Sequence, residues 1–250
     1  MVIDLRFDGK VIVITGAGSG MGLLASQKFA ESGAHVAMLD VNEEALLREA
    51  QKINDAGYSA LPILCNVREY EQIKSAVDKA YNAFGRIDAT VSFAGGNAER
   101  ICRDVSDFDI ERIETIDWGL EVNFRAPIYM AKAAFGYMKA QNSGVIVNIG
   151  SIDGVTGCNS PTYGPSKTGL LGLTKSVARQ GAKYGVRSVC VSPGPVLTRP
   201  EMANMKTMMG YAAEPIEIVE VILYLCSERA RSITGSNFLI DGGRACMVGM

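Results

Sequence analysis

Seven short apolar runs rich in β-branched residues recur along this 250-residue chain. Runs this short, bounded by Gly, Asn or Asp, are typical of buried strands rather than of helices. We expect strands at 11–15, 35–39, 60–64, 89–93, 144–149, 187–192 and 237–240. Stretches between them have the 3.6-residue period of amphipathic helices, and three of these stretches end at a glycine: Gly33, Gly57 and Gly85.

The alternation of strand and helix limits how the chain can fold. Parallel strands joined through helices form a sheet that is covered on both faces. No Pro-, Gly- or Ser-rich linker interrupts the pattern, which continues to the last expected strand. We therefore expect a single domain over residues 1–250, with a doubly wound α/β fold and a parallel sheet of about seven strands flanked by helices.

Composition and charge exclude several classes of function. The net charge is −2 and Lys and Arg are scattered, so nothing predicts binding to nucleic acid or to a membrane surface. The first 16 residues have the pattern of neither a signal peptide nor a membrane span. The six cysteines form no CxxC pair, which favours reduced thiols in a cytoplasmic protein. The single histidine, His35, is expected to be structural, which argues against Ser-His catalysis and a metal site.

A glycine-rich turn follows the first expected strand, in the stretch VIVITGAGSGMG. Gly16, Gly18, Gly20 and Gly22 let the backbone turn sharply and approach a pyrophosphate, whose charge then lies at the positive end of the next helix. Glycines also serve tight packing of helix on sheet. Here, however, strand, turn and amphipathic helix occur in the order that a Rossmann-like dinucleotide site requires.

Asp40 ends the second expected strand and completes this pattern. A carboxylate there accepts hydrogen bonds from the adenosine ribose hydroxyls and repels a 2′-phosphate. No Lys or Arg flanks Asp40 or follows the glycine turn, so the sequence favours NAD over NADP as the cofactor. The alternative is that Asp40 only caps the helix that begins near Asn42.

Tyr163 and Lys167 are four residues apart at the start of a helical pattern, which places them on one helical face. A nearby ammonium favours the tyrosinate and so lowers the tyrosine pKa from its reference of about 10. Such a tyrosine can exchange a proton with an alcohol or carbonyl oxygen. Ser151 follows the fifth expected strand, at the sheet edge where open α/β folds gather their sites. With no base to activate it, we expect its hydroxyl to hydrogen-bond the reacting oxygen rather than to attack.

Taken in order, these motifs resemble the short-chain dehydrogenases/reductases across essentially the full length of the chain. Each motif alone is a modest signal, but the ordered set is highly specific. The matching stretches are TGAGSGMG at 15–22, Asp40, FAGG at 93–96, VNFRA at 122–126, IVNIGS at 146–151, YGPSK at 163–167, SPGPVLT at 192–198 and ITGSNFLIDGG at 233–243.

The resemblance implies a catalytic tetrad and a cofactor site. Tyr163 would be the general acid/base, and Lys167 would lower its pKa and hold the nicotinamide ribose hydroxyls. Ser151 would orient the substrate oxygen, and Asn123 would hold a water that links Lys167 to solvent. Besides Tyr163 and Lys167, the residues expected to bind the cofactor are Gly16, Ser19, Gly20, Met21, Gly22, Asp40, Asn66, Val67, Ala94, Gly95, Pro193, Val196 and Thr198.

The chain departs from the family pattern at three positions. Phe93 stands where an asparagine usually steadies the sheet beside the adenosine, a change expected to affect local rigidity and cofactor affinity rather than the chemistry. Asn66 replaces a frequent aspartate, and its amide can still reach the adenine. Gly150 stands where a second serine is common, which we expect to be harmless.

Methionines gather in the segment 197–213, which in the family forms a mobile lid over the substrate. Methionine adapts to bulky apolar ligands, although the segment could equally pack as an ordinary helix against its own domain or a partner subunit. Beside Ser151 and Tyr163, we expect Cys158, Met202 and Met205 to contact the substrate. In the charged stretch 96–119, Arg100 and Arg103 either meet an anionic group at the rim or belong to a solvated loop.

The leading hypothesis is an NAD-dependent oxidoreductase that interconverts a secondary alcohol and a ketone, acting on a hydroxysteroid-like or other bulky apolar small molecule. A 3-oxoacyl-thioester reductase, acting on acyl carrier protein or CoA, and a polyol or sugar dehydrogenase are alternatives. A non-enzyme alternative is an NAD-sensing regulatory protein, but such proteins typically lose the tyrosine or lysine. Family members are usually dimers or tetramers built through the helices that contain Asn123 and Tyr163, and the apolar runs there permit a homo-oligomer.

Overall fold

The computed structural model of the chain describes residues 5–104 and 107–247. They form a parallel seven-stranded sheet in the order β3-β2-β1-β4-β5-β6-β7. The strands are β1 (Val11–Thr15), β2 (His35–Asp40), β3 (Ser59–Leu64), β4 (Ala89–Ser92), β5 (Gly144–Ile149), β6 (Val186–Pro193) and β7 (Asn237–Ile240). Every expected run is a strand whose ends lie within one residue of the prediction. The strands β1, β4 and β5 are buried throughout, whereas β7 at the sheet edge alternates exposed and half-buried residues.

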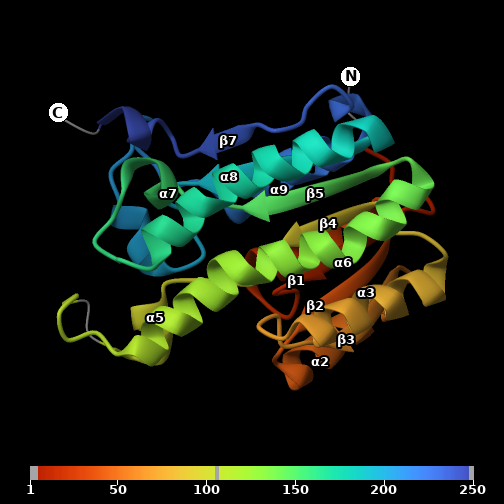
Figure 1. Ribbon diagram of the computed structural model, residues 1–250, viewed down its shortest axis with the longest axis horizontal. Coiled ribbons are helices and arrows are strands. Elements are labelled where there is room, and N and C mark those ends of the chain that lie inside the picture. Colours follow the sequence, from red (N-terminus) through yellow and green to blue (C-terminus); the bar gives the residue numbers. More distant parts are fainter. Residues whose placement is uncertain (1–4, 105–106, 248–250) are drawn as a thin grey trace.

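Long helices cover both faces of the sheet, as a doubly wound fold requires. One face carries α1 (Gly20–Glu31), α2 (Glu43–Asp55) and α9 (Pro215–Cys226), and the other carries α3 (Tyr70–Phe84), α6 (Ala126–Gln141) and α8 (Tyr163–Gly181). Figure 1 shows α6 and α8 running side by side across the front of the sheet. The predicted Rossmann-like α/β fold is therefore confirmed.

Two local expectations concern the helix ends and the histidine. Gly85 caps α3 in the left-handed conformation, with φ of 77°, as its position after an amphipathic stretch predicts. His35 Nδ1 lies 2.8 Å from Ser59 Oγ. Its ring stacks on Phe84 with centroids 4.7 Å apart. These contacts lie at the start of β2, far from the strand ends that carry the site, so His35 is structural.

The shorter elements gather at the carboxyl ends of the strands. These are α4 (Ala98–Cys102), α5 (Ile113–Leu120), the π-helical turn η1 (Glu121–Arg125), α7 (Asp153–Thr156) and the 3-10 turn η3 (Pro200–Asn204). In Figure 1 the arrows of β5 and β7 point toward the side where α5 and α7 lie. Open α/β sheets bind their ligands at this edge.

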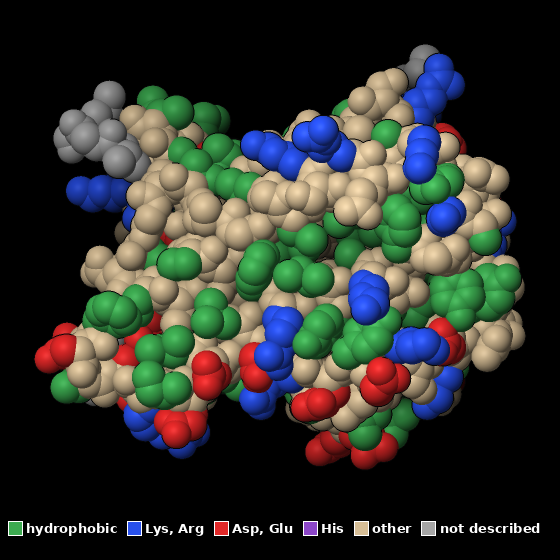
Figure 2. Space-filling model, in the orientation of Figure 1, with side chains coloured by type: hydrophobic (Ala, Val, Ile, Leu, Met, Phe, Trp, Pro, Cys, Tyr) green, Lys and Arg blue, Asp and Glu red, His purple; other side chains and the backbone are tan. Residues whose placement is uncertain are grey.

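The surface carries charges of both signs. On the face of Figure 2, Lys and Arg are interspersed with apolar side chains and with Asp and Glu. The six cysteines all belong to the described residues and are free. Over the described part of the chain, no helix is long and apolar enough to cross a membrane.

Candidate active site

A cleft of about 950 Å³ opens at the carboxyl ends of the strands. With the exception of Gly18 and Asn123, all the residues that the sequence assigned to the cofactor, the substrate or the tetrad line this cleft. Asn123 is fully buried. The structure therefore brings the predicted residues together, from positions as far apart as Gly16 and Met205.

The glycine turn is shaped by close backbone packing. Gly16 has φ of +68°, and a Cβ atom there would lie 2.9 Å from the backbone nitrogen of Ala94. A Cβ atom at Gly22 would lie 2.1 Å from the carbonyl oxygen of Gly16, so α1 can start only with glycine at this position. Ser19 precedes α1 without a side-chain capping bond. The N–H groups of the first turn are thus available to an anionic group such as a pyrophosphate.

Asp40 joins the end of β2 to the glycine turn. Its Oδ2 accepts a hydrogen bond from the Gly18 N–H at 2.8 Å, and its Oδ1 accepts one from the Asn42 N–H at 2.9 Å. The N-cap of α2 is Asn42, whose side chain accepts from the Ala45 N–H. The alternative that Asp40 only caps this helix is therefore wrong. Asp40 lies in the cleft, as a residue that meets the adenosine ribose must.

Asn123 lies in the π-helical turn η1 and fixes the turn after β4. Its amide Nδ2 donates to the carbonyl oxygens of Gly96 and Gly119 at 2.8 and 2.9 Å, and its Oδ1 accepts from the Gly96 N–H at 2.8 Å. A Cβ atom at Gly95 would lie 2.6 Å from Asn123 Oδ1 and 3.6 Å from Lys167 Nζ. The asparagine thus holds this turn beside the lysine, in a π-helical turn of the kind found at functional sites.

Lys167 is buried beneath the tyrosine. Its Nζ donates to the Ile149 carbonyl oxygen at 2.8 Å and lies 5.5 Å from the centre of the Tyr163 ring. Burial lowers the pKa of Lys167 to about 8. Burial in turn raises the pKa of Tyr163, while a hydrogen bond with Ser151 and the charge of Arg199 act in the opposite direction.

The sequence predicts that Lys167 lowers the pKa of Tyr163, but in the structure the pKa of Tyr163 is raised, and Lys167 is not among the groups that shift it. The ammonium lies under the ring and is bound to Ile149, and the loss of water around Tyr163 is the larger effect. Ser151 lies as expected just after β5, where its Oγ accepts from the Asp153 N–H at 3.1 Å.

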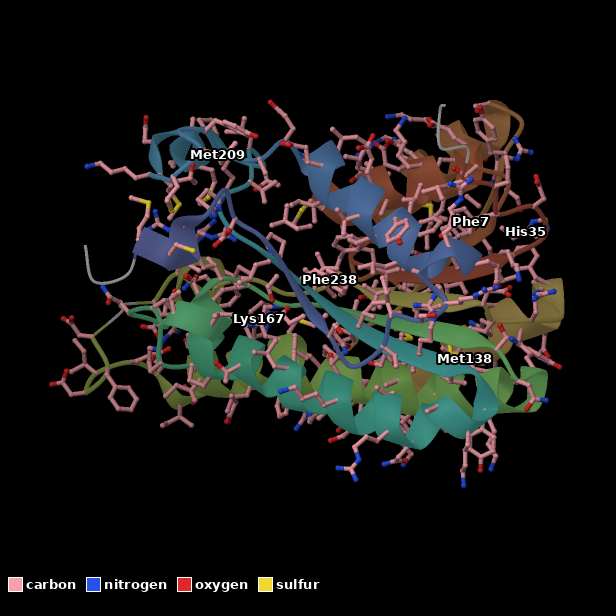
Figure 3. The ribbon with its side chains drawn as sticks, turned by 90° about the horizontal axis from the view of Figure 1, so that it is seen from above. Phe7, His35, Met138, Lys167, Met209 and Phe238 are labelled. Atoms are coloured by element: carbon pink, nitrogen blue, oxygen red, sulfur yellow. The ribbon has the colours of Figure 1, made fainter. Side chains whose placement is uncertain are left out.

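Backbone hydrogen bonds join the two ends of the segment 197–213. The Leu197 N–H donates to the Ala213 carbonyl oxygen, and the Ala213 N–H donates to the Pro195 carbonyl oxygen, both at 2.9 Å. Met202 and Met205 line the cleft, but Met208 and Met209 are 60% and 64% exposed and do not. Figure 3 shows Met209 well separated from Lys167.

The described residues of the stretch 96–119 include helices and buried carboxylates, in addition to the charged loop that the sequence suggests. The stretch contains α4 and α5, and Glu99 and Glu111 are only 3% and 7% exposed. Among the described residues, none of the oxygens of these two carboxylates has a hydrogen-bond partner. Arg100 lines the cleft and Arg103 does not, so the two arginines differ in position.

Several residues of the cleft were missed by the sequence reasoning. They include Trp118, Ile152, Asp153 and Arg199. Arg199 directly follows the predicted Thr198, and this adjacency was the available signal. Burial raises the pKa of Asp153, and the charge of Arg244 lowers it.

The comparisons with known proteins agree with this geometry. The model of the short chain dehydrogenase family matches residues 10–208. The chain is 30% identical over 249 residues to the 7alpha-hydroxysteroid dehydrogenase of Bacteroides fragilis, with 95% of each chain covered. It is 34% identical over 254 aligned positions to the 3-oxoacyl-[acyl-carrier-protein] reductase FabG of Thermotoga maritima, with 96% of this chain and 99% of that protein covered.

A solved structure gives the same result. The short-chain type dehydrogenase/reductase from Mycobacterium marinum is 30% identical, with a TM-score of 0.89 and 97% of each chain covered. The family match spans most of the chain, and the cleft holds the family's motifs in one place. The protein therefore belongs to the short-chain dehydrogenase/reductase family and is an oxidoreductase of alcohols and ketones that uses a nicotinamide cofactor.

Proposed function

We propose that this protein is an NAD-dependent dehydrogenase of a bulky, largely apolar secondary alcohol, or a reductase of the corresponding ketone. One observation carries the proposal. Tyr163, Ser151 and Lys167 line the same cleft as a glycine turn that is tied to Asp40.

The proton handling follows from the side chains. In the oxidative direction, the Tyr163 oxygen takes the proton of the substrate hydroxyl, and in the reductive direction it returns one to the carbonyl oxygen. The nicotinamide, when bound, supplies the acceptor or donor of the hydride. Ser151 hydrogen-bonds the reacting oxygen, and Lys167 holds the nicotinamide ribose hydroxyls. Asn123 keeps the turn after β4 in place and holds the water that relays protons from Lys167 to solvent.

The preference for NAD rests on Asp40. Its carboxylate lies in the cleft beside the glycine turn, next to Val41, which is 70% exposed and carries no charge. The guanidinium of Arg68, which also lines the cleft, is paired with Glu121, so it is not free for a 2′-phosphate. These contacts favour a cofactor whose ribose carries hydroxyls only.

Replacing the carboxylate tests this preference. For Asp40→Asn, we expect kcat/KM with NAD to fall about 10- to 100-fold, because hydrogen bonds to a charged acceptor are lost, and turnover with NADP to rise. The measurement is the absorbance of the reduced nicotinamide, with Asp55→Asn on the surface of α2 as the control. A wild-type protein that prefers NADP would overturn the assignment.

The substrate class is supported by the lining of the cleft. Ile101, Trp118, Ile152, Met202 and Met205 give it an apolar wall. The relative from Bacteroides fragilis is named for a hydroxysteroid, which has this character. The relative from Thermotoga maritima is named for a 3-oxoacyl thioester, so acyl-thioester reduction is the second candidate.

A panel of hydroxysteroids, polyols and 3-hydroxyacyl thioesters separates these candidates. We expect turnover with hydroxysteroids or similar cyclic alcohols, and its loss by a factor of about 100 to 10,000 in Tyr163→Phe with NAD binding retained. Turnover of thioesters alone would favour the second candidate. Turnover that survives Tyr163→Phe would contradict the assigned chemistry.

The organisation that we propose is one domain over residues 1–250, in which the segment 197–213 closes over the substrate. We place the protein in the cytoplasm, in keeping with its free cysteines. We propose that it forms a homo-oligomer through α6 and α8, since half-buried apolar residues such as Ile128 and Leu173 lie on these helices.

A further inference from the structure

Arg199 is a cation without a counter-charge inside the cleft. It follows Thr198 at the start of the segment 197–213, and its side chain is half-buried. Its side chain makes one weak contact, from Nη2 to the thioether sulfur of Met202 at 4.0 Å. No carboxylate of the described residues lies within ion-pair distance of Arg199. A charge that is partly removed from water is costly unless it is paired, so this guanidinium is suited to an anion from outside the chain.

The acids of the cleft do not supply that anion. The cation that acts on the Asp153 carboxyl is Arg244, and burial is the larger influence on its pKa. Both Glu99 oxygens are shielded from solvent and have no partner among the residues that the structure describes. The positive charge of Arg199 is therefore not neutralised by any carboxylate of residues 5–104 and 107–247.

Arg100 brings a second unpaired cation to the cleft from another element. It lies on α4, is exposed, and places its Nη2 3.6 Å from the position that a Cβ atom of Gly96 would occupy. Gly96 belongs to the turn that Asn123 holds. Arg100 therefore faces the cleft from the turn after β4, while Arg199 faces it from the segment after β6.

The position of Arg199 relates it to the reaction. Its charge acts on the Tyr163 hydroxyl, so the guanidinium lies within electrostatic reach of the reacting oxygen. Met202 and Met205, from the same segment, offer apolar contact in the same region. A ligand that pairs with the guanidinium and also packs against the two methionines has an apolar body and an anionic group a short distance from its reacting carbon.

We propose that Arg199 is a specificity residue that binds a carboxylate of the substrate, with Arg100 adding attraction at the rim. The substrate class is then a largely apolar secondary alcohol, or its ketone, that carries a carboxylate. This inference rests on the proposed function. The cofactor diphosphate offers the same oxyanion chemistry to a guanidinium, so the experiment must separate the two sources.

A matched pair of substrates gives the sharpest test. The pair is 4-hydroxycyclohexanecarboxylate and its methyl ester, which differ only in the charge. For Arg199→Gln, we expect the ratio of kcat/KM for the acid to kcat/KM for the ester to fall about 10- to 100-fold, mainly through KM of the acid. Because the effect of Arg199 on the Tyr163 pKa is common to both substrates, it cancels in the ratio. Arg199→Lys keeps the charge but loses the guanidinium fork, so it should recover part of the ratio.

Two controls complete the design. Arg103→Gln changes an exposed arginine outside the cleft and should leave the ratio unchanged. The affinity of Arg199→Gln for NAD without substrate tests the other source of the oxyanion. Weaker NAD binding together with an unchanged acid-to-ester ratio would assign Arg199 to the cofactor diphosphate and overturn the proposal.

A binding measurement keeps this inference separate from the proposed function. Trp118 is the single tryptophan of the chain and lines the cleft, so its fluorescence reports ligand binding. If neither the acid nor the ester is turned over with either cofactor, neither compound is a substrate of this enzyme. Tighter binding of the acid than of the ester, lost in Arg199→Gln, still supports the carboxylate site. Equal binding of acid and ester by the wild-type protein contradicts it.

Discussion

Lys167 is buried, and no carboxylate in the described part of the chain forms an ion pair with it. Its place in the site therefore has a cost in stability. Its Nζ has the Ile149 carbonyl oxygen as its described hydrogen-bond acceptor. Burial lowers its pKa from 10.5 in the unfolded chain to about 8 in the folded one. Between these two values the unfolded chain binds the proton more tightly. The contribution of this group to folding stability therefore rises as pH increases from about 8 to 10.5, and below about pH 8 the buried ammonium destabilises the fold.

We expect Lys167→Met to be more stable than the wild type near neutral pH. Removing the charge removes a cost of about 3 kcal/mol, less about 1 kcal/mol for the lost hydrogen bond to Ile149. The advantage should shrink as pH rises through the window between the two pKa values. Urea unfolding at neutral and at alkaline pH measures the difference, and turnover should be lost. A variant that is less stable than the wild type at neutral pH would refute this account.

At the scale of elements, α4 and the residues just before α5 carry two buried carboxylates, Glu99 and Glu111. Glu111 is 7% exposed, and burial together with the charges of Glu99 and Asp104 raises its pKa above the ordinary value. A group whose folded pKa is raised in this way loses stability as pH increases through the carboxyl range. Once ionised, the carboxylate of Glu111, which has no hydrogen-bond partner among the described residues, therefore weakens the packing of this segment.

We expect Glu111→Gln to stabilise the protein near neutral pH, by on the order of 1 kcal/mol, because the amide keeps the size of the side chain without its charge. Near pH 4, where the wild-type carboxyl holds its proton, the gain should vanish. Urea unfolding at the two pH values measures both effects. Glu114→Gln, at an exposed position of α5, is the matched control and should leave the free energy of unfolding unchanged at both pH values. Equal stability of Glu111→Gln and the wild type at both pH values would contradict the prediction.

The sequence predicts the long elements well because each carries its own signal. The β-branched runs are buried, and Gly85 ends α3 where the amphipathic period stops. The short elements carry no such signal: α4 has five residues and α7 has four, too few to show a helical period. The π-helical turn η1 is tied by hydrogen bonds of Asn123 to Gly96, which lies 27 residues away in the chain, and no local pattern predicts such a contact.

In the candidate site, too, some features could be predicted from the sequence and others could not. The motif residues could be assigned to the cleft from their order, but the pKa of Tyr163 could not, because it depends on how deeply the ring is buried. Gly150 gives a further example. A Cβ atom there would lie 2.3 Å from Ser192 Oγ and 2.8 Å from Cys190 Sγ, so side chains of β6 occupy the place of the family's second serine. Only the pairing of β5 with β6 reveals this compensation.

At the scale of the whole molecule, the face that carries α6 and α8 is the one through which we propose that the chain forms an oligomer. Figure 2 shows apolar side chains along the middle of this face. A Cβ atom at Gly169 of α8 would lie 2.7 Å from the ring of Phe124, so the two helical segments are already in close contact within one chain. We propose that their outward apolar residues contact a second copy of the chain.

We expect light scattering after size-exclusion chromatography to give the mass of a dimer or tetramer. Leu173→Arg places a charge on the half-buried apolar side of α8 and should shift the protein toward smaller species. Lys175→Ala, at an exposed position of the same helix, should leave the mass unchanged. A wild-type monomer at micromolar concentration would refute this assembly.

The order of the strands also has a consequence for synthesis. Asn123, Ser151, Tyr163 and Lys167 all leave the ribosome before β7, which is the last strand to be made and pairs only with β6. A nascent chain can therefore hold every residue of the tetrad while the edge of β6 is still without its neighbour. Such an edge offers unpaired backbone groups to other chains until residues 237–240 arrive. Chains truncated before β7 should accordingly aggregate, although they contain the complete tetrad.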